Sequence, residues 1–159
     1  AARGFEVLSD ELAVIDPESQ TVLPYRRNVH VRPGTPELVD GLGPLVDRPR
    51  ERLGGGIAWA VPQADLGAGA DDVAPRRLAG VILLHPRDPS LHAPSIAPVR
   101  SSLAAMELLR GTWAASVDYV GSMEAMARAI RDVPCARLAS ADPMPSADLV
   151  ATWLETVDG

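Results

Sequence analysis

Two adjacent carboxylates, Asp10 and Glu11, stand in the middle of an otherwise apolar segment near the start of the chain. The flanking residues, FEVLSDELAVI from Phe5 to Ile15, are mostly aliphatic, which predicts a largely buried strand. Ionised carboxylates are costly to bury without a partner, so the pair is expected to meet a cation, an arginine or water. A Mg²⁺ ion held at the strand end is one solution, in which Asp10 also orients or deprotonates an attacking hydroxyl. A salt bridge at the rim of a hairpin is the alternative.

Three arginines, Arg26, Arg27 and Arg32, accompany alternating valines between residues 26 and 32. The alternation predicts a half-exposed strand, with one buried face and one face that presents arginine and histidine. Planar guanidinium groups match phosphate and carboxylate groups and bind them through two hydrogen bonds, so Arg26, Arg27 and Arg32 are candidate anion-binding residues, with Arg32 preferred. The alternative is a solvated strand face with an ion pair or two.

The other reactive side chains form no recognisable site. His30, His85 and His92 lack the spacing of zinc ligands, so we expect structural roles for them. A metal-dependent hydrolase that uses His30 with Asp10 rests only on their closeness in the sequence. The glycines at 54–56 are followed by neither a lysine nor a helix signal, which indicates a hinge or tight turn rather than a phosphate loop.

The composition excludes several classes of function. All 15 basic residues are arginine, and the absence of lysine excludes Schiff-base chemistry and the phosphate-binding lysine of a Walker A loop. A formal net charge of -6 argues against a nucleic-acid surface. The single cysteine, Cys135, allows no internal disulfide and indicates a reducing compartment, so we expect a cytoplasmic protein. No apolar run approaches the length of a membrane span, so we expect no membrane partner.

The order of elements predicts one α/β domain over residues 1–159, with strands first and helices later. Turn residues at 16–20 join the first strand to a short partner at 21–25, which predicts a hairpin. The apolar run at 78–84, stopped by His85 and Pro86, predicts a central strand. Further expectations are a long loop with short helical turns at 33–56, a strand at 57–61, a mobile connection at 62–75 and a short strand at 135–139.

Helical spacing appears in the C-terminal third of the sequence. Three helices are expected: one capped by Ser101 or Ser102 and ending at Gly111, one capped by Ser122 and ending before Pro134, and one capped by Ser146. The residues expected on their apolar faces are Leu103, Met106 and Leu109; Met123, Met126, Ala127 and Ile130; and Leu149, Val150, Trp153 and Leu154.

The segment GFEVLSDELAVIDPESQTVLPYRRNVHVR, residues 4–32, resembles the stretch that follows the phosphate loop in HPr kinase/phosphorylase-like proteins, particularly the HprK-related kinases often seen with peptide-modification systems. Asp10 and Glu11 fall on the family's acidic metal-binding and base pair, and Arg27 and Arg32 on its basic positions. The later strands and helices follow the family's order. The resemblance implies a P-loop kinase-like (HPr kinase/PEP carboxykinase-like) mixed sheet with C-terminal helices, incomplete at the N-terminus because the upstream strand, glycine-rich loop and lysine are absent.

The resemblance also implies ATP and Mg²⁺ as ligands, with phosphate transferred to a hydroxyl of a protein, peptide or small molecule. Glu11 replaces the second aspartate of the bifunctional enzymes, and Arg26 and Asn28 replace residues that are usually proline. Without a phosphate loop the chain is not expected to be competent alone, and its start at Ala1 leads us to expect a fragment of a longer protein. The alternative is a non-catalytic binding or interaction module on a degenerate kinase fold, with residues 33–56 as a partner surface. A homo-oligomer is compatible with either hypothesis.

Overall fold

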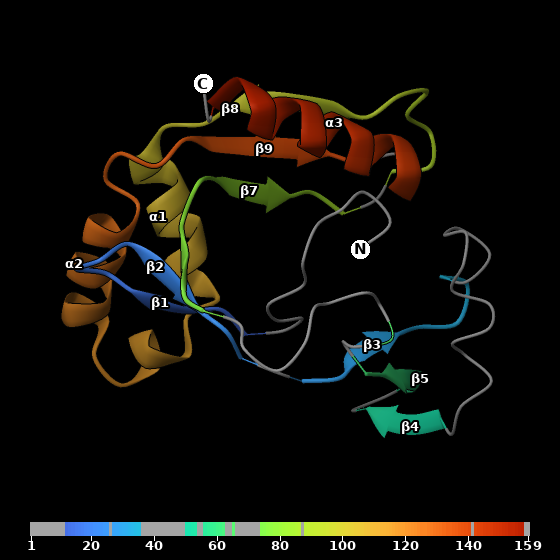
Figure 1. Cartoon of the computed structure of the whole chain (residues 1–159), viewed down its shortest axis with the longest axis horizontal. Coiled ribbons are helices and arrows are strands. Elements are labelled where there is room, and N and C mark those ends of the chain that lie inside the picture. Colours follow the sequence, from blue (N-terminus) through green and yellow to red (C-terminus); the bar gives the residue numbers. More distant parts are fainter. Residues whose placement is uncertain are drawn as a thin grey trace. The chain divides into compact units, whose positions relative to one another are not determined.

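The computed structural model describes residues 12–25, 27–35, 50–53, 56–62, 65, 74–86, 88–140 and 142–157. Within these residues the protein is a mixed α/β fold with three three-stranded sheets (Figure 1). The chain divides into two compact units: unit 1 comprises residues 1–14 and 23–75, and unit 2 comprises residues 15–22 and 76–159. Asp10, Glu11, Arg26 and most of the strand expected at 5–15 lie outside the described residues.

The predicted hairpin is confirmed. Strand β1, Val14–Asp16, is followed by the turn at residues 17–20 and by its neighbour β2, Thr21–Leu23. The sheet continues with β6, Arg76–Arg77, in the order β1-β2-β6, with Thr21 opposite Arg77 and Val22 opposite Arg76 in an antiparallel pair. The sequence did not predict β6, because two exposed arginines carry no hydrophobic alternation.

Unit 1 contains an antiparallel sheet with the order β3-β5-β4. Strand β5, Gly56–Val61, confirms the strand expected at 57–61, and β3, Val29–Val31, confirms the core of the one expected at 26–32. Strand β4, Arg50–Leu53, corrects the prediction of a loop through 33–56, because these residues pair with β5 through backbone groups despite their charged side chains. The three strands thus bury one small apolar face: Val31, Trp59 and Val61, with Val29 packed against them.

The main sheet of unit 2 has the order β7-β9-β8. Strand β7, Val81–Leu84, pairs in parallel with β9, Cys135–Ala139, and β8, Ser95–Pro98, pairs with β9 on its other side in the antiparallel sense. The strand predicted at 78–84 is confirmed over Val81–Leu84, but in the described sheet it lies beside β9 and not at the centre. The central strand is β9, whose residues are all buried or half-buried, whereas β7 ends at the 73% exposed Leu84. An apolar run predicts that a strand is buried, but it does not predict the strand's position in the sheet.

The predicted helices of unit 2 are present, but their N-terminal caps differ from the prediction. Helix α1 begins after Arg100, whose carbonyl accepts hydrogen bonds from the N–H groups of Leu103 and Ala104, so neither Ser101 nor Ser102 is its cap. The helices are α1, Ser101–Arg110; the short 3₁₀ helix η3, Trp113–Ser116; α2, Tyr119–Ala129; and α3, Pro143–Val157.

Helix α2 is capped by Asp118 rather than by Ser122, because the Asp118 carboxylate accepts a hydrogen bond of 2.9 Å from the N–H of Gly121. Ser146 lies inside α3, with its hydroxyl donating at 2.7 Å to the carbonyl of Asp142, so the predicted cap at Ser146 is also wrong. Pro143 has no N–H to lose at the first helical position, which explains the earlier start.

The core of unit 2 lies between its sheet and its helices. Helix α1 contacts β7 and α2, and α3 contacts β8. Gly80 lies against Trp153 of α3, where an added Cβ would come within 2.8 Å of two ring atoms of the indole. The buried core residues are Val81, Leu83, Ala104, Ala129, Ile130, Val133 and Cys135.

Candidate functional site

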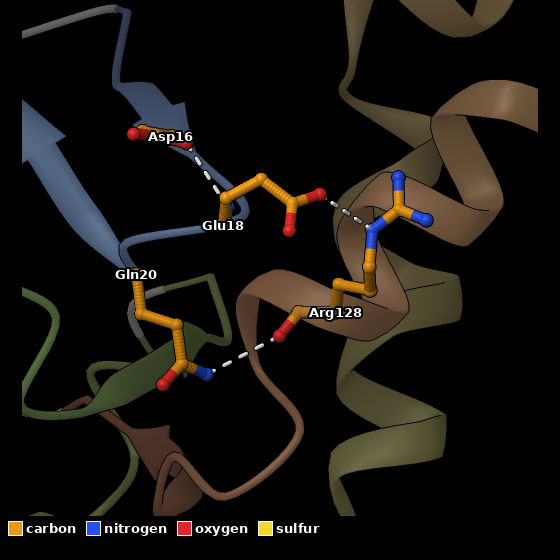
Figure 2. A network of polar contacts seen from close by, with 4 residues as sticks. All are labelled: Asp16, Glu18, Gln20 and Arg128. Carbon is orange, nitrogen blue, oxygen red and sulfur yellow. Dashed lines mark hydrogen bonds and ion pairs between the residues drawn. The ribbon is translucent and has the colours of Figure 1, made fainter.

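The turn between β1 and β2, which follows the predicted carboxylate pair in the sequence, holds a network of polar contacts (Figure 2). The Asp16 carboxylate accepts hydrogen bonds from the Ser19 hydroxyl at 2.6 Å and from the N–H of Glu18 at 3.0 Å. These two donors hold the pKa of Asp16 below its ordinary value because they stabilise the ionised form. Aspartate followed by Pro17 therefore closes the turn by an Asx-type interaction, as its residue types predict.

The same turn is fastened to the C-terminal end of α2. The Gln20 side-chain amide donates to the carbonyls of Arg128 at 3.2 Å and Ala129 at 3.1 Å, and Glu18 forms an ion pair of 3.3 Å with Arg128 (Figure 2). The last carbonyls of a helix have no partner within the helix, so the amide satisfies that of Ala129 and adds a donor to that of Arg128, which also accepts from the N–H of Arg131 at 3.4 Å. Gln20 adopts a positive φ of 53°, and its own carbonyl accepts from the N–H of Leu78 at 2.8 Å. The hairpin is thereby joined to two other segments of unit 2.

Of the four residues predicted to form the site, the structure describes two. Arg27 precedes β3 in the sequence and Arg32 directly follows it, both in unit 1, and both side chains are exposed. Val31 between them is buried, so the alternation predicted for this strand is confirmed at this end. Asp10 and Glu11 lie outside the described residues, and their roles therefore stay predictions. Among the described residues no group of three or more His, Cys, Asp or Glu side chains is arranged to hold a metal ion.

The chain's own donors fit only part of the ligand set that the resemblance implies. Carboxylate oxygens such as those of Asp10 and Glu11 are ligands that Mg²⁺ prefers. P-loop kinases bind the phosphates of a nucleotide through a lysine and a nest of backbone N–H groups, and the 159 residues contain no lysine and no glycine-rich phosphate loop. These residues alone thus do not fit ATP.

The remaining candidates from the sequence are the three histidines, the cysteine and the glycine run. His85 and His92 are exposed, and His30 is half-buried in β3. Cys135 is a buried free cysteine whose thiol donates to the carbonyl of Val133, and burial raises its pKa, which disfavours the reactive thiolate. Gly54 and Gly55, where a tight turn was predicted, lie outside the described residues, although Leu53 and Gly56 on either side of them are paired.

A surface that sequence reasoning missed lies on the helices of unit 2. Leu103 and Met106 of α1 and Met123 of α2 were predicted to be buried, but they are 53%, 60% and 47% exposed. The predicted apolar positions Leu109 and Ile130 are confirmed as buried, at 5% and 1% exposure, whereas Ala104, at 0%, was not predicted to belong to the core. The signal that was available is the near absence of charge from residue 111 to residue 123.

No family model, curated protein or solved structure matches the chain. In the part of the chain that the structure describes, no helix combines the length and the apolar character that crossing a membrane requires.

Proposed function

We propose that the chain is the part of an HPr kinase-like phosphotransferase that follows the phosphate loop, and that the intact enzyme transfers phosphate from ATP to a hydroxyl of a protein, peptide or small molecule. The observation that carries the proposal is the β1–β2 hairpin, which follows the Asp10–Glu11 pair in the sequence and is fastened to α2 through Glu18 and Gln20. Such anchoring limits the movement of the turn at residues 17–20, and phosphoryl transfer depends mainly on positioning.

The proposed roles divide between carboxylates and arginines. Asp10 binds Mg²⁺ or accepts the proton of the attacking hydroxyl, and Glu11 supports it. Arg27 and Arg32 are exposed and therefore accessible to the phosphates or to the acceptor. In the transfer, the acceptor oxygen bonds to the γ-phosphorus, the bond from that phosphorus to ADP breaks, and the hydroxyl proton passes to the base. The missing phosphate loop makes the upstream segment essential for this reaction.

Calorimetric titration with ATP and Mg²⁺ tests the proposal on the 159-residue chain and on the same chain extended upstream to its natural start codon. Only the extended chain is expected to bind. Arg27→Ala and Arg32→Ala should weaken that binding, whereas Arg110→Ala, an exposed arginine at the end of α1, is the matched control and should not. An extended chain that binds no nucleotide would contradict the proposal. An extended chain that binds ATP without turning it over would contradict its catalytic part.

A non-catalytic interaction module is the second candidate, and one observation favours it. The exposed apolar side chains of α1, η3 and α2 are numerous for a surface that contacts only water. A 159-residue chain that is a stable monomer without any response to nucleotide, also after upstream extension, would favour this module. Aggregation of the short chain alone would favour the kinase fragment, because removing a strand exposes a sheet edge.

A further inference from the structure

Five large apolar side chains are exposed within eleven consecutive residues of unit 2, and we call them the 113–123 surface. Trp113 is 80% exposed, Val117 79%, Tyr119 60%, Val120 60% and Met123 47%. Isolated exposed hydrophobic residues are normal, but a contiguous set of this size on a soluble protein marks a contact surface. Tryptophan, tyrosine and methionine are moreover the residue types that protein interfaces favour.

The local structure explains why these side chains lie together. Met123 lies four positions after Tyr119 and three after Val120 in α2, and residues at these spacings are neighbours on a helix surface. Ala129 lies in the core on the side of α2 that faces away from Val120, and Met126 packs against the core at the border of the surface. Trp113 and Val117 belong to η3 and its C-terminal cap, and η3 contacts α2 directly. The surface is therefore an extension of the outer side of α2.

Charge is almost absent from this segment. Between Gly111 and Met123 the only carboxylate or guanidinium group is that of Asp118, and this carboxylate is engaged with the N–H of Gly121 as the helix cap. In the whole chain 23% of residues are charged. A surface with a single carboxylate offers little charge to a basic or acidic partner, whereas the same apolar side chains on another copy can cover it.

The size of the surface fits a weak symmetric dimer. Covering two aromatic and three aliphatic or thioether side chains from their present exposure removes on the order of 600 Å² from each copy. Two copies together then bury on the order of 1,200 Å², which is the lower limit for a specific interface. Ala114 of η3 is also exposed and adds to this area.

We propose that the 113–123 surface is a self-association interface, at which two copies of this chain pack α2 and η3 against the same elements of the partner about a two-fold axis. The net charge of -6 on each copy opposes this association at long range, and salt screens that repulsion. The dimer is therefore expected to strengthen as salt is added, in contrast to an interface held by ion pairs.

Sedimentation velocity over a concentration series tests the proposal, on the 159-residue chain and on the chain extended upstream. Both are expected to dimerise reversibly, with tighter association at about 0.5 M than at about 0.05 M sodium chloride. Trp113→Arg is expected to raise the dissociation constant at least about tenfold, because a central aromatic is replaced in both copies of a symmetric interface. The side chain is 80% exposed, so folding should be retained, which circular dichroism verifies.

Leu84→Arg is the matched control, because Leu84 is 73% exposed but lies on β7, outside the 113–123 surface. This change is expected to leave the dissociation constant unaltered. A dimer lost with Leu84→Arg and kept with Trp113→Arg would instead indicate pairing at the sheet edge and would overturn the proposal. Monomeric behaviour at all concentrations would overturn it as well. So would a dimer of the short chain that disappears on upstream extension, since the surface would then be covered by the protein's own preceding segment.

Discussion

The two compact units contrast in what they bury. In unit 2 the β7-β9-β8 sheet and the helices enclose seven buried residues, including Ile130 at 1% exposure and Ala104 at 0%. In unit 1 the described β3-β5-β4 sheet buries a cluster of three residues, Val31, Trp59 and Val61. Burial of apolar area is the main favourable term in folding, so the described core of unit 2 contributes the larger share of stability.

The contrast bears on where function is expected. Arg27 and Arg32, the described candidates for anion binding, belong to unit 1 with its small cluster, whereas the anchored hairpin turn belongs to unit 2. Regions with few buried contacts open more readily than cores, and binding residues are often carried by such regions on a stable scaffold. We therefore expect unit 2 to act as the scaffold and unit 1 to adapt to ligand.

Ile130→Ala should have the largest effect, because it empties the centre of the unit 2 core. The expected loss is about 3 kcal/mol in the free energy of unfolding, the usual range for truncating a fully buried isoleucine. Urea denaturation followed by circular dichroism measures it. Met123→Ala in α2, the helix that ends just before Ile130, is the control. Because Met123 is 47% exposed, this change should lower the free energy of unfolding far less. Equal losses for the two variants would refute the described packing of α2.

Gly80→Ala should follow, with an expected loss of about 2 kcal/mol, because the added methyl group overlaps the Trp153 ring. The glycine at this position allows α3 to approach the start of β7. Thermal unfolding of this variant, of Trp153→Leu and of the double variant measures the interaction free energy between positions 80 and 153. Overlap predicts that Gly80→Ala is less harmful when Trp153 is already replaced; additive effects would show that the two residues do not compete for space.

Val61→Ala tests unit 1, where the expected loss is about 1.5 kcal/mol because two buried methyl groups are removed. The decisive measurement is amide hydrogen exchange across the chain. Protection should fall in β3 and β5 and change little in β7 and β9, because Val61 belongs to the cluster of unit 1. A uniform fall over both units would remove the distinction between scaffold and adaptable unit.

The smallest expected effect concerns Asp16 in the hairpin turn. Its folded pKa is depressed below 3.8 by the Ser19 hydroxyl and the Glu18 N–H. The turn therefore gains stability that is present above pH 3.8 and is lost as the pH falls through the folded pKa. Carboxyl titration by NMR should show that Ser19→Ala raises the pKa of Asp16 toward its ordinary value.

Ser90→Ala is the matched control for this titration, because Ser90 lowers the pKa of Asp88 in the same way. It should raise the pKa of Asp88 and leave that of Asp16 alone. If Ser19→Ala left Asp16 unchanged, the hydrogen bond would not be the cause of the shift.

The sequence predicted the position of an element where its residue types matched its observed structure and burial. The hairpin turn has Asp16 and Pro17, and β5 and β9 are apolar, so their places were predicted. Strand β4 was missed because Arg50–Leu53 is dominated by charge, and β8 because Pro98 lies within it. Strand position and helix caps depend on pairing in three dimensions, which residue spacing does not contain.

The candidate site was predictable only in its exposed arginines. Arg27 and Arg32 were expected on the exposed face of a strand, and both are exposed, but they lie just outside β3, Val29–Val31. The hydrogen bonds from Gln20 to Arg128 and Ala129 at the end of α2 span 108 and 109 positions of sequence. No local sequence pattern predicts contacts over such a separation. The 113–123 surface was assigned partly to the core because an apolar stripe looks the same whether it meets the core or a partner.

The Mg²⁺ dependence of ATP binding by the chain extended upstream tests the central claim most directly. Calorimetry with Asp10→Asn, Glu11→Gln and the control Asp16→Asn compares the proposed metal ligands with a carboxylate of the neighbouring turn. We predict that Asp10→Asn abolishes the Mg²⁺ dependence, that Glu11→Gln reduces it, and that Asp16→Asn preserves it. An unchanged Mg²⁺ dependence in Asp10→Asn, or no ATP binding by the extended chain at all, would contradict the assignment of this chain to a phosphotransferase.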